Sequence, residues 1–187
     1  MSRIAVFCGS RNPVDSAFKQ SAWDLGALLA RGSHELIYGG ASVGLMGAVA
    51  DGCIRNKGTV IGVMPDFMQL PEQTHQGLHE LRIVSSMHER KLQMSDRADA
   101  FIALPGGFGT LDEIFEIITW RQIGLHQKPI GLLNTQGYFD SLLAFIASAQ
   151  RSGLIDSQHL DFLNVDQNPE PLLRLICDQI TSPLHKI

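Results

Sequence analysis

The sequence has little of several features that mark other classes of protein. It contains three cysteines, Cys8, Cys53 and Cys177, whose odd number and wide spacing fit neither a disulfide framework nor a zinc site. Such a set is typical of a reducing compartment. No apolar run is long enough to span a bilayer, and the first one is too short for the core of a signal peptide. Charged residues make up 18% of the chain and the formal net charge is -4, which disfavours broad binding to a nucleic-acid backbone. We therefore expect a soluble cytoplasmic protein that binds neither membranes nor nucleic acids.

What the sequence does contain is enough apolar residues for one globular domain. The 187 residues are 44% hydrophobic, so a single domain spanning residues 1–187 can bury its own core. Short β-rich apolar runs alternate with apolar residues at helical spacing. The expected strands cover residues 4–8, 36–38, 60–64, 81–84, 100–104, 130–133 and 160–165, and the expected helices cover residues 18–29, 45–53, 87–97, 111–118, 138–152 and a stretch after residue 169.

This alternation predicts a fold class. Strands that alternate with helices form parallel sheets with crossover connections, and unbroken apolar strands belong to sheets covered on both faces. The expected fold is an α/β, Rossmann-like, doubly wound parallel sheet in a three-layer αβα sandwich. In such sheets, ligands bind at the carboxyl ends of the strands.

Three of the expected strands end in glycine-bearing loops, at residues 8–11, 38–44 and 104–110. Glycine lets a backbone approach a ligand closely, and the free N–H groups at a helix start attract anions, most often phosphate. The alternative is that these glycines only make tight strand-to-helix turns. Three such loops at one edge of the sheet favour the anion site.

Two standard phosphate fingerprints are missing from these loops. The pattern Gly-x-Gly-x-x-Gly, begun at Gly107, would need a third glycine where Asp112 stands. The Walker pattern would need a lysine after Gly44, and Leu45 follows instead. Neither a nicotinamide-dependent dehydrogenase nor a P-loop NTPase is expected.

The third loop carries a carboxylate with two possible roles. Thr110 followed by Glu113 is the pattern of a capping box, in which Glu113 would only satisfy backbone N–H groups. Alternatively, Glu113 faces the ligand crevice one turn into the helix, where the positive helix end keeps it ionised. An ionised carboxylate there can stabilise a developing cation, act as a nucleophile or activate water.

Other candidate residues give weaker signals. Arg90 and Lys91, in the first turns of a predicted helix, could hold phosphate or ribose oxygens, or could simply be a solvated helix face. His75 and His79 have i,i+4 spacing, but without a third ligand no metal site is expected. Cys8, at the end of the first strand, fits a small core residue better than a nucleophile.

Two motifs resemble those of a known family. Residues 105–113 read Pro-Gly-Gly-Phe-Gly-Thr-Leu-Asp-Glu, and residues 87–91 read Met-His-Glu-Arg-Lys. They match the Pro-Gly-Gly-x-Gly-Thr-x-x-Glu and Met-His-x-Arg-Lys signatures of the Lonely Guy family, which are cytokinin-activating nucleoside 5′-monophosphate phosphoribohydrolases. The resemblance also covers residues 8–10, 38–47, 118–124 and 128–134, so it extends over most of the chain and is weakest near the C-terminus.

The resemblance implies a set of site residues. Glu113 and Arg90 would be the catalytic pair. Substrate contacts would come from a phosphate-binding loop and from residues around it: Gly106, Gly107, Phe108, Gly109, Thr110, Asp112, Ser10, Gly40, Met87, Lys91, Thr119 and Glu72. Glu72 stands at the family's distance upstream of the second motif, although its neighbours depart from the usual context.

The resemblance also implies an activity and an assembly. The expected reaction is hydrolysis of the N-glycosidic bond of an adenine-type nucleoside 5′-monophosphate, either AMP or a cytokinin nucleotide, to the free base and ribose 5-phosphate. No cofactor and no metal are expected, and family members are typically homodimers. The family often bears a lysine decarboxylase label, but nothing in this sequence suggests a pyridoxal phosphate site. The alternative function is a non-catalytic nucleotide or cofactor carrier on the same fold.

Overall fold

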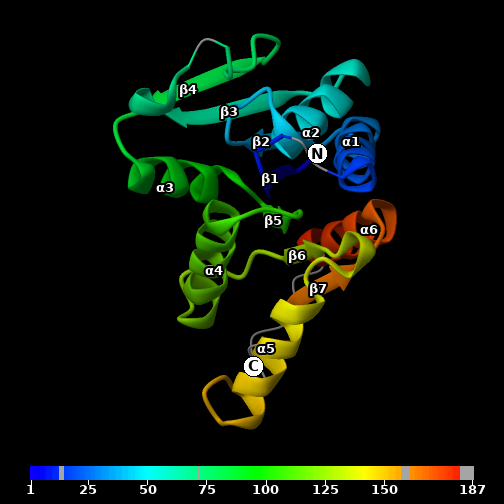
Figure 1. The fold of residues 1–187 in the computed structure, drawn as a ribbon, viewed down its shortest axis with the longest axis vertical. Coiled ribbons are helices and arrows are strands. Elements are labelled where there is room, and N and C mark those ends of the chain that lie inside the picture. Colours follow the sequence, from blue (N-terminus) through cyan, green and yellow to red (C-terminus); the bar gives the residue numbers. More distant parts are fainter. Residues whose placement is uncertain (13–14, 71, 157–160, 182–187) are drawn as a thin grey trace.

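The computed structural model describes residues 1–12, 15–70, 72–156 and 161–181, and within them seven strands form one parallel sheet (Figure 1). The strand order is β4-β3-β2-β1-β5-β6-β7, and each neighbouring pair is parallel. Because the chain first adds strands on one side of β1 and then on the other, the sheet is doubly wound, as predicted. The strands are β1 (Arg3–Phe7), β2 (Glu35–Tyr38), β3 (Val60–Pro65), β4 (Glu80–Val84), β5 (Ala100–Ala103), β6 (Ile130–Leu133) and β7 (Leu163–Asp166).

Helices cover both faces of this sheet. One layer contains α1 (Ser16–Arg31), α2 (Gly44–Arg55) and α6 (Pro169–Thr181), and the other contains α3 (Met87–Arg97), α4 (Phe108–Gln122) and α5 (Asp140–Arg151) (Figure 1). Two short 3-10 turns, η1 (Asp66–Met68) and η2 (Thr135–Gly137), lie in connecting segments. The predicted three-layer αβα sandwich is confirmed.

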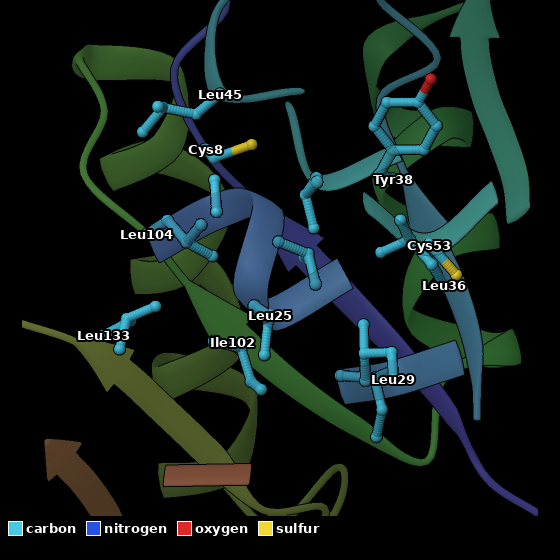
Figure 2. Close-up of a cluster of buried hydrophobic side chains, with 14 of the residues drawn as sticks. Cys8, Leu25, Leu29, Leu36, Tyr38, Leu45, Cys53, Ile102, Leu104 and Leu133 are labelled. Carbon is cyan, nitrogen blue, oxygen red and sulfur yellow. The ribbon is translucent and has the colours of Figure 1, made fainter. Parts of the chain in front are cut away.

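The core divides into two parts because side chains of a strand alternate between the faces of the sheet. In β1, Ile4 and Val6 belong to the cluster under α1, α2 and α6, whereas Ala5 and Phe7 belong to the cluster under α3, α4 and α5. Figure 2 shows the first cluster, in which Leu25 and Leu29 of α1 lie near Ile102 of β5. A strand that is apolar on both faces therefore reads as an unbroken apolar run, which explains why the strands were predictable.

One connection and one strand boundary differ from the regular pattern. Strands β3 and β4 are parallel neighbours, yet the described residues between them, 66–70 and 72–79, form η1 and a loop rather than a crossover helix, in agreement with the irregular polar composition of residues 66–77. The last strand was expected over residues 160–165 and is found at Leu163–Asp166, while Leu160 lies outside the described residues. Within the described ranges, no helix combines the length and apolarity that a membrane span requires.

Candidate active site

A cavity of about 630 Å³ opens at the carboxyl ends of β1 and β5, where the strand order changes direction. This is the place where a doubly wound sheet binds its ligand, and the volume suits a small molecule. Its walls are the loop after β1, the glycine loop that leads into α4, and apolar side chains from several elements: Phe18, Leu45, Met46, Met68, Met87 and Phe108.

The floor of the cavity holds a buried ion pair that joins α3 to α4. Arg90 donates from Nη1 to the carboxylate of Glu113, and the two side chains are 6% and 4% exposed. Arg90 also donates from Nε to the carbonyl of Val63, 3.0 Å away, at the end of β3. Because the guanidinium is held on two sides, it fixes the carboxylate of Glu113 at the cavity wall.

The capping-box interpretation of Glu113 is wrong. Helix α4 begins at Phe108, its N-cap is Gly107, and no side chain caps it, so Thr110 lies inside the first turn rather than at the N-cap. The carboxylate of Glu113 therefore turns to Arg90. A side-chain cap is present instead at α3, where the hydroxyl of Ser86 accepts from the N–H of Glu89 at 3.1 Å.

Burial controls the protonation of two groups in this cavity. It raises the pKa of Glu113, and the guanidinium of Arg90 offsets part of that rise. The sequence-based expectation that the helix end alone keeps Glu113 ionised thus omitted the larger influence, which is the loss of solvent. Burial also raises the pKa of the Cys8 thiol, so at neutral pH Cys8 is a protonated wall residue rather than a nucleophile.

The second glycine loop makes room for the ion pair. A Cβ at Gly39 would lie 2.5 Å from Nη2 of Arg90 and 3.0 Å from the terminal carbon of Met46. Any larger residue at this position would push the guanidinium away from Glu113. Position 39 therefore requires glycine, because the guanidinium of Arg90 lies too close to its backbone for any side chain.

The three glycine loops differ in whether their N–H groups remain free. The carbonyl of Gly9 accepts from the first-turn N–H groups of Leu45 and Met46, at 2.9 and 3.3 Å, so the start of α2 is already capped. The N–H of Gly9 itself donates to the carbonyl of Pro105, 3.0 Å away. At the start of α4, the first bond within the helix runs from Leu111 to the carbonyl of Gly107. The N–H groups of residues 108–110 precede that bond, and these residues border the cavity, so the third loop is the one whose helix start has N–H groups available to an anion.

The structure brings most of the predicted site residues together. The cavity is lined by Glu113, Arg90, Ser10, Met87, Gly106, Gly107, Phe108, Gly109 and Thr110. The remaining predicted contacts do not line it. Gly40 is buried, with its carbonyl accepting from the N–H of His75, and Thr119 donates to the carbonyl of Phe115 further along α4. Glu72 is exposed in the loop after η1.

Lys91 and Asp112 connect the two helices outside the cavity. The ammonium of Lys91 lies 3.1 Å from Asp112 and 3.2 Å from Glu116, which flank Glu113 on α4. Burial lowers the pKa of Lys91, but the hydrogen bonds to both carboxylates raise it above its ordinary value overall. Lys91 therefore fixes α3 against α4 in this structure, with its charge already balanced.

Several cavity residues escaped the sequence analysis. Arg11 lies in the glycine-bearing loop 8–11 and Met46 in the family-like segment 38–47, but neither was named as a contact, and no motif includes Met68. Tyr138 reaches the site from the segment after η2 and donates from its hydroxyl to the carbonyl of Gly106, 2.6 Å away. Its ring also packs edge-on against Phe18, with centroids 5.5 Å apart. No local sequence signal predicts a contact between segments this far apart in the chain.

The two histidines with i,i+4 spacing, for which no metal site was expected, have other partners in the structure. His75 lies 3.3 Å from Asp51, and the ring of His79 accepts from the N–H of Val60 at 3.2 Å. Among the residues that the structure describes, no group of three His, Cys, Asp or Glu side chains is arranged to hold a metal ion.

Fold and site together define an α/β protein with a glycine loop at a helix start beside a buried glutamate–arginine pair. Comparisons with known proteins place it more closely. The family model described as "Possible lysine decarboxylase" matches residues 46–176. Cytokinin riboside 5′-monophosphate phosphoribohydrolase LOG3 of Arabidopsis thaliana is 48% identical over 82% of this chain and 71% of its own length. LOG7 of the same plant is 43% identical over 97% and 87%. The chain belongs to this family, the Lonely Guy family.

Solved structures with the same fold include carriers. The molybdenum cofactor binding protein of Rippkaea orientalis has a TM-score of 0.73 with 22% identity, covering 96% of this chain and 97% of its own. The molybdenum cofactor carrier protein of Chlamydomonas reinhardtii has a TM-score of 0.72 with 19% identity, covering 98% and 99%. At these identities the likeness concerns the fold alone.

Proposed function

We propose that this protein hydrolyses the N-glycosidic bond of adenine-type nucleoside 5′-monophosphates and releases the free base and ribose 5-phosphate. The observation that carries the proposal is the buried pair of Glu113 and Arg90 beside the free N–H groups of α4. The activity for which relatives that are 43–48% identical are named supports it.

The arrangement suits the charge changes of this reaction. The 5′-phosphate binds at the start of α4, where the N–H groups of residues 108–110 and the positive helix end stabilise an anion. Anchoring the phosphate fixes the ribose, and orientation of this kind can contribute several kcal/mol toward the barrier, up to about 7–11 kcal/mol in the best cases. The anomeric carbon is then held near the carboxylate of Glu113.

Glu113 acts on the ribose as the bond to the base breaks. Cleavage builds positive charge on the ribose ring, and an ionised carboxylate stabilises that charge. Water adds its oxygen to the anomeric carbon, Glu113 accepts the proton that this water loses, and the base leaves with a proton from solvent. Arg90 holds Glu113 in place, and its positive charge favours the ionised carboxylate against the effect of burial.

The base lies against the apolar wall of the cavity. Met46, Met68 and Met87 supply polarisable sulfur atoms that pack well on an aromatic ring. This wall suits adenine and also an N6-substituted adenine with an apolar group. AMP and the cytokinin nucleotides are therefore both proposed substrates.

One experiment tests the activity and separates the substrates. Purified protein is incubated with AMP and with isopentenyladenosine monophosphate, with and without EDTA, and chromatography detects the released base. We expect base release from at least one nucleotide, with no effect of EDTA. Stable nucleotide binding over hours without base release would favour the carrier function, for which the Glu113–Arg90 pair has no evident use.

We also propose that the protein acts in the cytoplasm as a homodimer. Three free cysteines suit a reducing compartment. Large apolar side chains are exposed at the end of α4 and on α5, with Ile123, Leu125 and Phe145 each more than 60% exposed, as expected of an uncovered interface. Light scattering after size exclusion tests the assembly, and a mass of one chain, 20.5 kDa, would contradict it.

A further inference from the structure

The cavity carries an unbalanced positive charge. Among the described residues that line it, three side chains bear a full charge: Arg11, Arg90 and Glu113. Arg90 and Glu113 neutralise each other in the buried pair. Arg11 thus gives the cavity a net charge of +1, which attracts an anionic ligand.

Arg11 stands close to the anion-binding end of α4. The loop after β1 touches the glycine loop: the N–H of Gly9 bonds to the carbonyl of Pro105 at 3.0 Å, and a Cβ at Gly106 would lie 2.9 Å from the nitrogen of Gly9. Arg11 follows Gly9 by two residues and lines the same cavity as the first turn of α4.

The other cations near this end are engaged. Arg90 is bound to Glu113 and to the carbonyl of Val63, and Lys91 is bound to Asp112 and Glu116. Arg11 is exposed, and in the described parts of the chain no carboxylate forms an ion pair with it. A guanidinium can bind a phosphate through two parallel hydrogen bonds and supplies a full positive charge. Backbone N–H groups also donate hydrogen bonds to the phosphate, but they carry no full charge.

We propose that Arg11 binds the 5′-phosphate of the substrate opposite the first turn of α4 and is the residue that separates nucleotides from nucleosides. This inference rests on the proposed function, because it takes the ligand to be a nucleoside monophosphate. It assigns the charge recognition to a loop residue outside both sequence motifs. Glu113 and Arg90, by contrast, act on the ribose end.

Calorimetric binding tests the role of Arg11 without requiring turnover. The probes are ribose 5-phosphate, which carries the phosphate, and adenosine, which lacks it. The proteins are the unchanged chain, Arg11→Ala, Arg11→Lys, and the control Arg31→Ala, which removes an exposed arginine at the far end of α1. Base release from AMP and from isopentenyladenosine monophosphate by the unchanged chain is measured separately.

The expected result is a selective loss. Arg11→Ala weakens ribose 5-phosphate binding by about 10- to 100-fold, the range for a charged hydrogen-bonding partner, and leaves adenosine binding unchanged. Arg11→Lys loses less, and Arg31→Ala loses nothing. Unchanged ribose 5-phosphate affinity in Arg11→Ala, or an equal loss for adenosine, would overturn the proposal. A selective loss in a protein that releases base from neither AMP nor isopentenyladenosine monophosphate would support Arg11 while refuting the hydrolase function.

Discussion

Replacing Gly39 by alanine should disable the active site through one methyl group. The added Cβ would lie 2.5 Å from Nη2 of Arg90, whereas non-bonded carbon atoms settle at about 3.5–4.0 Å. The guanidinium must therefore retreat by about 1 Å. Its two hydrogen bonds, to Val63 and to Glu113, cannot both survive that shift, because hydrogen bonds weaken steeply away from ideal geometry. The backbone of Gly39 does not have a positive φ, so alanine adds no backbone strain.

The consequence is a catalytic defect larger than the loss of stability. A displacement of about 1 Å in a positioning group costs about 100-fold in rate, so kcat for base release should fall by roughly that factor. The control is Gly131→Ala in β6, where the atoms nearest to an added Cβ are the terminal carbons of Leu172 and Ile176, at 3.1 and 3.3 Å, and no group of the active site. The assay is kcat from chromatographic base release, with circular dichroism to confirm folding. A folded Gly39→Ala protein with unchanged kcat would refute the assignment of Arg90 as the group that positions Glu113.

Three further predictions concern the surroundings of the pair. Tyr138→Phe removes the donor to the Gly106 carbonyl, so KM for the nucleotide should rise a few-fold with kcat little changed, since one neutral hydrogen bond contributes about 1 kcal/mol; an unchanged KM would argue against loop positioning. Lys91→Met leaves Asp112 and Glu116 unpaired, so it should lower the free energy of unfolding, measured in urea, by about 1 kcal/mol. A higher KM at unchanged stability would instead indicate that Lys91 contacts the substrate. Because burial raises the pKa of Glu113 and the ionised form is the active one, kcat should fall as the pH drops through that raised pKa, above the ordinary value of about 4.3; a pH profile that stays flat down to pH 4 would contradict this.

The sequence predicted the fold because the five inner strands, β1, β2, β3, β5 and β6, bury nearly all of their residues. Runs such as residues 100–104 are apolar without interruption, and only a sheet covered on both sides accepts them. The helix over Met87–Arg97 was likewise predicted, and the local signal at its start is Ser86, whose hydroxyl accepts from the N–H of Glu89. These signals come from residues close together in the chain, so they can be recognised from a single sequence.

The candidate site was predictable where a motif spans it and not elsewhere. The glycine loop and Glu113 lie within nine consecutive residues, so the motif includes both. The partner of Glu113 was less certain from residue patterns alone, since Thr110 and Glu113 also fit a capping box, and only the start of α4 at Phe108 excludes that interpretation. Tyr138 and Arg11 depend on contacts between distant loops, which no local pattern encodes.

The most direct test of the account is the turnover of Glu113→Gln, which keeps the shape of the side chain and removes its charge. Base release from the preferred nucleotide should fall by about 100- to 10,000-fold, while nucleotide affinity stays within a few-fold of the unchanged protein. Glu116→Gln, one turn further along α4, serves as the matched control and should keep its rate. A Glu113→Gln protein that releases base at the original rate and only melts at a lower temperature would contradict the central claim.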